Sequence, residues 1–210
     1  MSLEQRLGRR FARVATNAVV RRPELWRLFR GPMRRQFERL APQWDAIRMP
    51  GHLAAFEAAL GAVTTTPSQA LDLGTGTGQG AVAIARRFPD AHVVGVDLAP
   101  AMIGEAQAAL PADVAGRIEF RQADASALPF GDALFELLGL ANMIPFFDEL
   151  DRVLAPGGWA VFGYSVGRET PIYVPPERLR AELGRRGFAE FAEFSEGRGT
   201  AFLARKRRRE

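Results

Sequence analysis

The stretch Leu71-Asp72-Leu73-Gly74-Thr75-Gly76-Thr77-Gly78 decides how this chain folds. It follows the short apolar run from Ala70 to Leu73, which is typical of a strand. After the glycines, apolar residues recur at helical spacing from Ala81 to Phe88, and Pro89 ends that helix. Glycines between a strand and a helix let the backbone turn tightly and approach a ligand closely. The free N–H groups at the helix start predict a site for a carboxylate or a pyrophosphate.

The rest of the chain repeats this alternation of strands and helices. Strands are predicted at 92–96, 117–121, 134–140 and 159–164, and helices at 52–60, 102–110, 146–154 and 176–187. Two last strands, 188–194 and 200–205, flank the turn signal Glu196-Gly197-Arg198-Gly199. Strands joined by helices form a doubly wound parallel sheet. We therefore predict an α/β fold: a Rossmann-like, mostly parallel, seven-stranded sheet with a C-terminal antiparallel hairpin and an N-terminal helical cap.

Two aspartates follow neighbouring strands at the edge of the sheet where ligands bind in such folds. Asp97 closes the second strand, 19 residues after Gly78, and a carboxylate there can accept two hydrogen bonds from a ribose diol. Asp124 follows the third strand, where a carboxylate can accept from an exocyclic amine while a neighbouring backbone N–H donates to a ring nitrogen. The Asp124 carboxylate and this backbone N–H would together recognise adenine.

Four motifs occur in a fixed order along the chain. They are Asp72–Gly78, Val96-Asp97, Ala123-Asp124 with Leu128-Pro129-Phe130, and Arg152-Val153-Leu154-Ala155-Pro156-Gly157-Gly158. In this order they resemble the class I methyltransferases that use S-adenosyl-L-methionine (SAM), and most of all the group that methylates small molecules and lipid quinones. The resemblance covers roughly residues 40 to 205. It implies SAM as the cofactor and methyl transfer to an acceptor as the reaction.

The resemblance also implies roles for the matched positions. Asp72 would lie near the ammonium of SAM, and the loop would hold the methionine half through Gly74, Thr75, Gly76 and Gly78. Asp97 would take the ribose hydroxyls, and Leu98 would pack on the adenine. The adenine edge would be held by Asp124 and the backbone of Ala125, and the sulfonium would lie near Gly139 and Leu140.

Trp44, in Gln43-Trp44-Asp45, takes the place of an aromatic residue that closes over SAM in related enzymes, although it could equally be a packed core tryptophan. Two departures from the family stand out. The fourth strand has Phe135-Glu136 where the family prefers Phe-Asp, and the stretch from Gly139 to Arg152 is short. Either residues 142–147 or the N-terminal helices must therefore line the acceptor pocket.

No residue is required as a catalytic group, because SAM is already activated and the enzyme mainly aligns the acceptor with the methyl group. His52, Asn142 and Tyr164 are candidates for a base, but each also suits a structural role, so the catalytic residue stays unassigned. The apolar stretch from Met143 to Phe147 favours a small, partly apolar acceptor. An Asn-Pro-Pro-Tyr motif and an added RNA-binding module are absent, so we do not expect a nucleic-acid partner.

Three other functions remain open at this point. A SAM-binding scaffold without turnover would fit the short stretch after Gly139. An NAD-dependent oxidoreductase would fit the G-x-G-x-x-A pattern from Gly76 to Ala81, but would leave the later motifs unexplained. An RNA methyltransferase is the third. The sequence is compatible with a monomer or a homodimer.

The first fifty residues form a distinct basic segment. They contain twelve arginines and four acidic residues, a net charge of +8, with apolar residues at spacings of three and four. We predict amphipathic helices that Pro23, Pro32, Pro42 and Pro50 break into pieces. This gives three parts: a cap at 1–50, the methyltransferase domain at 51–205 and a frayed, solvated basic tail at 206–210. The cap would pack on the domain, and peripheral membrane contact is the alternative.

Composition excludes several classes of function. The 210 residues include no cysteine and only two histidines, which excludes thiolate chemistry and argues against a metal site. No run of about 18 apolar residues or signal peptide is visible, so we expect a cytoplasmic protein without a transmembrane segment. The net charge of +4 would suit an anionic partner, such as nucleic acid or a membrane surface, but a general preference for arginine also accounts for it, since Lys206 is the only lysine.

Overall fold

Seven strands form one sheet in the order β3-β2-β1-β4-β5-β7-β6 in the computed structural model, which describes residues 3–208. The strands are β1 Gln69–Leu73, β2 His92–Asp97, β3 Ile118–Gln122, β4 Phe135–Ala141, β5 Leu154–Tyr164, β6 Phe188–Glu196 and β7 Gly199–Lys206. Neighbours from β3 to β5 run parallel, and β7 runs antiparallel to both β5 and β6. The predicted α/β sheet with its antiparallel hairpin is confirmed.

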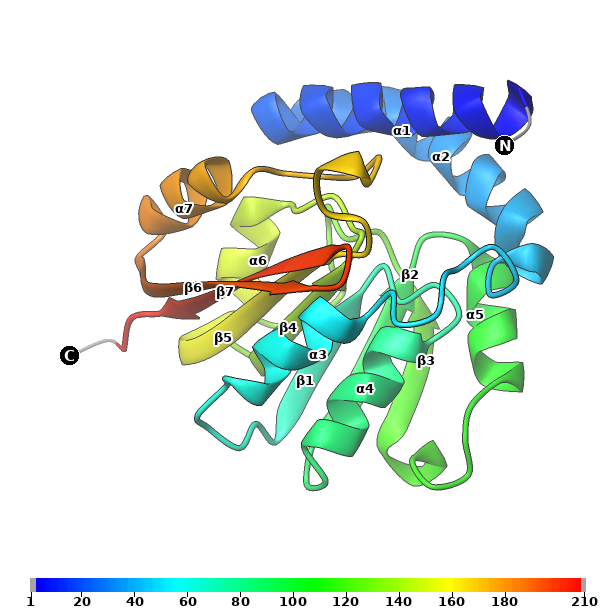
Figure 1. Ribbon diagram of the computed structural model, residues 1–210. Coiled ribbons are helices and arrows are strands. Elements are labelled where there is room, and N and C mark those ends of the chain that lie inside the picture. Colours follow the sequence, from blue (N-terminus) through cyan, green and yellow to red (C-terminus); the bar gives the residue numbers. More distant parts are fainter. Residues whose placement is uncertain (1–2, 209–210) are drawn as a thin grey trace.

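Helices cover both faces of this sheet and one of its edges. They are α1 Leu3–Arg21, α2 Trp26–Leu40, α3 Ala54–Gly61, α4 Gln79–Arg87, α5 Pro100–Ala108, α6 Phe147–Val153 and α7 Pro176–Gly184, with 3₁₀ turns η1 Pro23–Leu25, η2 Ala41–Gln43, η3 Ala115–Arg117 and η4 Gly167–Glu169. In Figure 1, α3, α4 and α5 lie on one face, α6 and α7 lie on the other, and α1 and α2 cross above the carboxyl ends of the parallel strands. None of the helices within residues 3–208 is long and apolar enough to span a membrane.

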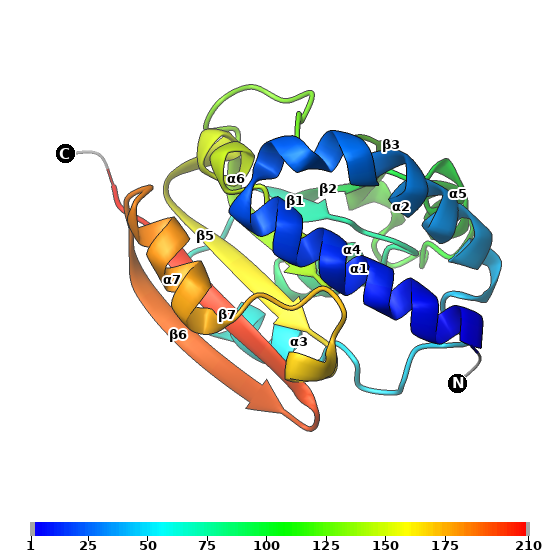
Figure 2. The same cartoon turned by 90° about the horizontal axis from the view of Figure 1, so that it is seen from above.

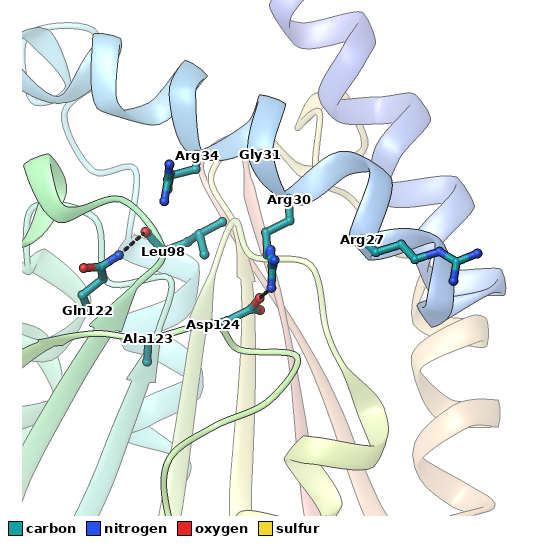
Figure 3. A pocket seen from close by; sticks show the side chains of 8 residues that line it. All are labelled: Arg27, Arg30, Gly31, Arg34, Leu98, Gln122, Ala123 and Asp124. Carbon is teal, nitrogen blue, oxygen red and sulfur yellow. Dashed lines mark hydrogen bonds and ion pairs between the residues drawn. The ribbon is translucent and has the colours of Figure 1, made fainter.

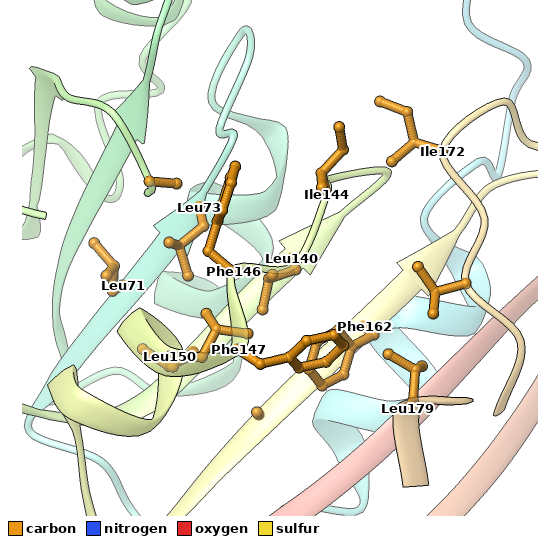
Figure 4. Close-up of a cluster of buried hydrophobic side chains, with 14 of the residues drawn as sticks. Leu71, Leu73, Leu140, Ile144, Phe146, Phe147, Leu150, Phe162, Ile172 and Leu179 are labelled. Carbon is orange, nitrogen blue, oxygen red and sulfur yellow. The ribbon is translucent and has the colours of Figure 1, made fainter. Parts of the chain in front are cut away.

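The core consists of two main apolar clusters, one on each face of the sheet. One joins α3, α4 and α5 to the sheet through side chains such as Phe56, Ile84 and Ile103. The other joins α6, α7 and the N-terminal helices to the opposite face, and Figure 4 shows its central part, including Leu150, Phe162 and Leu179. Covered on both faces, β1 and β4 are mostly apolar, and their polar residues are Gln69 and Asp72 in β1 and Glu136 in β4.

The N-terminal segment forms two long helices, and one predicted break is wrong. Pro23 and Pro42 lie in the 3₁₀ turns that follow α1 and α2, as predicted. Pro32 instead lies inside α2, which continues to Leu40. An internal proline costs a helix about 3 kcal/mol. Trp26 and Met33 lie on either side of it and are buried against the domain, so tertiary packing offsets the lost hydrogen bond.

Two details of the last strands also differ from the prediction. The segment Pro156-Gly157-Gly158 lies within β5, where it forms an irregularity: β4 advances from Phe135 to Leu137 while β5 advances from Leu154 to Trp159. Lys206 belongs to β7 rather than to a frayed tail, because it pairs with Phe188 and its ammonium lies 2.7 Å from the Asp151 carboxylate. Arg209, also placed in that tail, lies outside the described residues.

Candidate functional site

The loop between β1 and α4 has a backbone that only glycine adopts easily. Gly74, Gly76 and Gly78 have φ angles of +66°, +54° and +85°. A Cβ on Gly78 would also lie 2.6 Å from Cζ of Phe120. The loop is tied down by Thr75, whose N–H donates to the carbonyl of Val96 at 2.9 Å. This geometry leaves α4 starting directly at the carboxyl edge of the sheet.

Asp97, at the end of β2, fastens this loop to the next one. Its Oδ2 accepts a hydrogen bond from the N–H of Gly76 at 3.0 Å, and its Oδ1 accepts one from the N–H of Ala99 at 2.9 Å. Burial raises the pKa of the Asp97 carboxyl, and these backbone hydrogen bonds oppose that rise. Each carboxylate oxygen has a second lone pair, so Asp97 can still accept from a ligand.

Asp72 lies beneath the loop at the end of β1 and is almost fully buried. Thr75 Oγ1 donates to its Oδ2 at 2.6 Å, and α4 approaches so closely that a Cβ on Gly80 would lie 2.7 Å from its Oδ1. Burial raises the pKa of Asp72 to about 7. Across the sheet it pairs with Gly139 of β4, so both residues belong to the same edge.

Trp44 and Arg48 cover the loop from above. A Cβ on Gly76 would lie 3.3 Å from Nε1 of Trp44 and 3.2 Å from Nη2 of Arg48. The Arg48 guanidinium lies 5.3 Å from the centre of the Trp44 ring, and Phe37 packs edge-on against the same indole. The indole N–H is buried and has no hydrogen-bond acceptor within the described residues. An unpaired buried donor beside a glycine loop is the feature expected where a ligand supplies the acceptor.

Polar contacts hold this covering segment in place. Thr77 Oγ1 donates to Oδ1 of Asp45 at 2.6 Å, and Gln79 Nε2 donates to the same oxygen at 2.9 Å. Arg48 makes only longer contacts, at 3.4 Å to Thr77 Oγ1 and 3.6 Å to Asp45. Burial lowers the pKa of Arg48, whereas the carboxylates around it raise it. A guanidinium with such weak partners can still bind an anion strongly.

Asp124, after β3, is held by the N-terminal helix α2. Trp26 Nε1 donates to its Oδ1 at 2.9 Å, and Arg30 Nη1 lies 3.3 Å from its Oδ2. The N–H and hydroxyl of Ser126 also donate to Oδ1. The neighbouring Ala125 is buried. The carboxylate that the sequence suggests for adenine is therefore already bound by the cap.

A cavity of about 500 Å³ opens beside Asp124. Figure 3 shows α2 above it, with Arg30 reaching down to the Asp124 carboxylate. Its floor comes from the ends of β2 and β3, and its lining residues are Arg27, Arg30, Gly31, Arg34, Leu98, Gln122, Ala123 and Asp124. Leu98 thus lies where a planar base entering the cavity would contact it.

The end of β4 contains Gly139 and Leu140, which the resemblance places near the sulfonium, and the segment after it brings Met143 to the glycine loop. A Cβ on Gly139 would lie 2.8 Å from Cδ1 of Ile84, so this position faces the core beneath α4. Leu140 is buried in the cluster on the opposite face. Met143 contacts the loop: a Cβ on Gly74 would lie only 2.6 Å from the Met143 Sδ. The short segment after β4 therefore touches the glycine loop through a thioether.

Two of the three candidate bases, Asn142 and Tyr164, have structural roles: one is hydrogen-bonded and the other is buried. Asn142 Oδ1 accepts from the N–H of Ser165 at 2.9 Å, which ties β4 to the turn after β5. Tyr164 is buried against the ring of Tyr173, and burial raises the pKa of its hydroxyl. Neither group is free to accept a proton near neutral pH.

His52 keeps more of the character of a base. Its Nδ1 lies 3.1 Å from the carbonyl of Met49, and its Nε2 is buried without a partner in the described part of the chain. Burial and the nearby Arg48 charge lower its pKa, so the ring is neutral at pH 7.

Glu136, which stands where the family prefers aspartate, contacts a residue that is distant in the sequence. Its carboxylate accepts hydrogen bonds from the N–H and the hydroxyl of Ser68, the residue before β1. These bonds fix the start of β1 against β4. The longer side chain thus serves the amino edge of the sheet, opposite the glycine loop.

Trp26, Arg30 and Arg48 were not predicted at this site from the sequence, and Met143 was predicted only within the segment that lines the acceptor pocket. Trp26 and Arg30 lie in the basic segment, where they were assigned only to an amphipathic helix. Arg48 lies only three residues after Asp45, with which it forms an ion pair, so the motif Trp44-Asp45 could have pointed to it. Met143 carried no signal beyond its place in the short apolar segment.

Comparison with known proteins agrees with this geometry. Residues 70–158 match the model of a family described as a methyltransferase domain. The chain is 38% identical over 138 residues to a demethylmenaquinone methyltransferase of Thermus thermophilus, covering 58% of this chain and 60% of that protein. It is 40% identical over 101 residues to a trans-aconitate 2-methyltransferase of Methylobacterium radiotolerans, covering 44% and 36%. The matches thus span about 60% or less of these relatives.

Solved structures show the same fold. A SAM-dependent methyltransferase from Aquifex aeolicus superposes with a TM-score of 0.64 at 15% identity, covering 79% of this chain and 97% of that one. The sheet order argues against the NAD-dependent oxidoreductase. A Rossmann dinucleotide fold does not insert an antiparallel β7 between β5 and β6. Residues 70–158 of the chain therefore match a methyltransferase domain, and the motif order and sheet topology resemble those of the class I SAM-dependent methyltransferases.

Proposed function

We propose that this protein is a cytoplasmic SAM-dependent methyltransferase that acts on a small, partly apolar acceptor. The observation that carries the proposal is the glycine loop with one unpaired donor, the Trp44 N–H, and one weakly paired cation, Arg48, beside it. Three glycines in left-handed conformations let the backbone approach a ligand closely, and the Trp44 N–H and the Arg48 guanidinium lie directly above Gly76. The absence of cysteine fits a reducing compartment.

In this proposal the methionine half of SAM lies in the glycine loop. Its carboxylate would accept from Trp44 Nε1, which lacks a partner in the described residues, and would pair with Arg48, whose present contacts are long. Its ammonium would lie near Asp72, with Thr75 beside it, and the bound cation would favour the ionised carboxylate. Met143 would have to turn away from Gly74, which its unbranched side chain permits.

The adenosine half would occupy the cavity beside β2 and β3. Asp97 would accept from the ribose hydroxyls with its free lone pairs, and Leu98 would pack on the base. Asp124 and the Ala125 backbone would hold the adenine edge. Arg30 would give way most easily, because its side chain is 59% exposed and its contact with Asp124 is 3.3 Å long.

The acceptor would lie between α2 and the segment after β4. Trp26 of α2 packs edge-on against Phe146, with ring centres 5.3 Å apart, and Ile144 is buried in the same cluster. The N-terminal helices thus cover the place that the short segment leaves open. Apolar walls of this kind favour an acceptor with an aromatic or aliphatic body, in line with the relatives' small-molecule names.

The residues of this chain would act by positioning rather than by bond chemistry. SAM supplies an activated methyl group, so the protein has to align the acceptor and exclude water. The cap and residues 143–147 exclude water, and Asp97 with the loop fixes the donor. His52, neutral at pH 7, is the candidate to accept a proton where the acceptor has to lose one.

Titration calorimetry with SAM and S-adenosylhomocysteine tests the cofactor site. The wild-type protein should bind both ligands, and Asp97→Ala should lose binding. The control is Asp113→Ala, because Asp113 is exposed and its only recorded side-chain partner in the described residues is Arg86. Failure of the wild-type protein to bind either ligand would refute the assignment of the site.

Arg48→Gln separates the two halves of the site. A hydrogen bond to a charged group contributes about 1.5–3 kcal/mol, so SAM should bind about 10-fold to 150-fold more weakly. Adenosine, which lacks the carboxylate, should bind the variant as well as the wild type. An equal loss for both ligands would show that Arg48 only supports the fold.

Turnover is tested by screening quinones, phenols and short RNAs for S-adenosylhomocysteine release. Methylation of RNA alone would contradict the small-molecule acceptor. Binding of SAM without turnover on any acceptor would favour the scaffold function instead.

A further inference from the structure

The first fifty residues carry most of the large apolar side chains that are exposed at the surface. Six such side chains are recorded as exposed in the described residues, and five of them precede residue 50: Leu7, Val14, Leu28, Ile47 and Met49. The sixth, Leu134, lies in the loop before β4. Single exposed apolar residues are common, but a concentration on one segment indicates an interaction surface.

On α1 these side chains alternate with arginines along one stripe. Leu7, Arg10, Val14 and Arg21 follow one another at intervals of three, four and seven residues, and all four are exposed. Such intervals place them on the same side of a helix. The opposite side of α1 is the one that packs on the domain, through Ala12, Ala15 and Val19. The exposed stripe is therefore not needed for the fold.

A second stripe on α2 has the same composition. Leu28, Arg35 and Arg39 lie seven and four residues apart, and Leu28 is 62% exposed. In the part of the chain that the structure describes, neither Arg35 nor Arg39 makes an ion pair, and the same holds for Arg10 and Arg21. Figure 2 shows α1 and α2 side by side on the same side of the molecule. We call the two stripes together the cap surface.

We propose that the cap surface docks on the surface of an anionic phospholipid bilayer. Arginines can extend their guanidinium groups to lipid phosphates while aliphatic side chains enter the boundary between headgroups and acyl chains. Charge complementarity supports this partner, because residues 1–50 carry a net charge of +8. RNA would also pair with the arginines, but it gives no role to Leu7, Val14 and Leu28.

Docking in this orientation has a consequence for the site. The N-terminal helices cross the carboxyl ends of the parallel strands, so the edge that holds the glycine loop would face the bilayer. An apolar acceptor dissolved in the membrane would then have to pass only the N-terminal helices to reach the site. The docking itself does not depend on methyl transfer, and it can be tested without cofactor or turnover.

Vesicle flotation of the full-length protein tests the proposal. The protein should float with vesicles of phosphatidylcholine and phosphatidylglycerol, should stay in solution with phosphatidylcholine alone, and should be released by high salt. An arginine near an anionic surface contributes about fivefold to the partition coefficient, so Arg10→Gln/Arg21→Gln should bind about 30-fold more weakly. The matched control Arg86→Gln/Arg87→Gln removes the same charge from the far end of α4 and should bind much like the wild type.

Apolar variants distinguish a bilayer from a purely electrostatic partner. Leu7→Gln/Val14→Gln should also lose flotation, whereas Leu134→Gln, an exposed leucine elsewhere, should not. Circular dichroism confirms that each variant is folded. The proposal is overturned if the wild type does not float with anionic vesicles, or if Leu7→Gln/Val14→Gln floats as well as the wild type. Binding to a short single-stranded RNA without flotation would assign the surface to nucleic acid instead.

Discussion

Asp72 should make the stability of this protein fall as pH rises through neutrality. Its carboxyl is buried at the end of β1, and burial raises its pKa to about 7, although hydrogen bonds from Thr75 and Ala81 oppose the rise. In the unfolded chain the same group has a pKa of about 3.9. At intermediate pH the native state therefore holds a proton that the unfolded state has released.

The sign and size of the effect follow from this difference. Because the native state binds more protons, the contribution to stability is fully present below about pH 4 and is lost as pH rises through 7. Between about pH 5.5 and about pH 8.5 the two pKa values predict a loss of about 2 kcal/mol. Asp72→Asn cannot ionise, so it should remove this loss and unfold at higher urea concentration than the wild type at the upper pH.

Urea unfolding at both pH values measures this directly. The control is Asp113→Asn, because Asp113 is exposed and the pKa of its carboxyl is held low by Arg86, so it stays ionised throughout this range. The quantity of interest is the change in unfolding free energy with pH, compared between the wild type and each variant. If the wild type and Asp72→Asn lose the same stability between the two pH values, Asp72 is not the group responsible.

Two further substitutions test the loop and the cap. Gly78→Ala should destabilise the protein by more than Gly187→Ala in thermal unfolding: both glycines have a φ of +85°, which costs alanine about 1–2 kcal/mol, but only Gly78 is crowded, by Phe120. Equal effects would show that the crowding relaxes without cost. Trp26→Phe keeps an aromatic ring but leaves Asp124 without the indole donor, a loss of about 1–2 kcal/mol. Limited trypsin digestion should then cut within residues 1–50 faster than in the wild type, and unchanged cleavage would mean that this hydrogen bond does not hold the cap.

The sequence alone determined that the chain forms a mostly parallel sheet, the succession of strands and helices along the chain, and the position of the glycine loop. These follow from local rules: apolar runs form buried strands, helical spacing forms amphipathic helices, and left-handed turns require glycine. Asp97 could be placed for the same reason, because the ends of neighbouring parallel strands always meet at one edge. The break predicted at Pro32 failed because a local rule was outweighed by the burial of Trp26 and Met33.

What covers the site was decided only by the tertiary structure. Trp26 binds Asp124 across 98 residues of sequence, and Arg13 of α1 donates to the carbonyl of Thr170 across 157. The contact of Met143 with Gly74, and of Arg48 with Gly76, likewise joins separate elements. No periodicity encodes such pairs, because each depends on how two packed elements meet in space. The local sequence thus specifies where a ligand can bind, whereas the packing of α1 and α2 on the sheet decides which side chains surround that ligand.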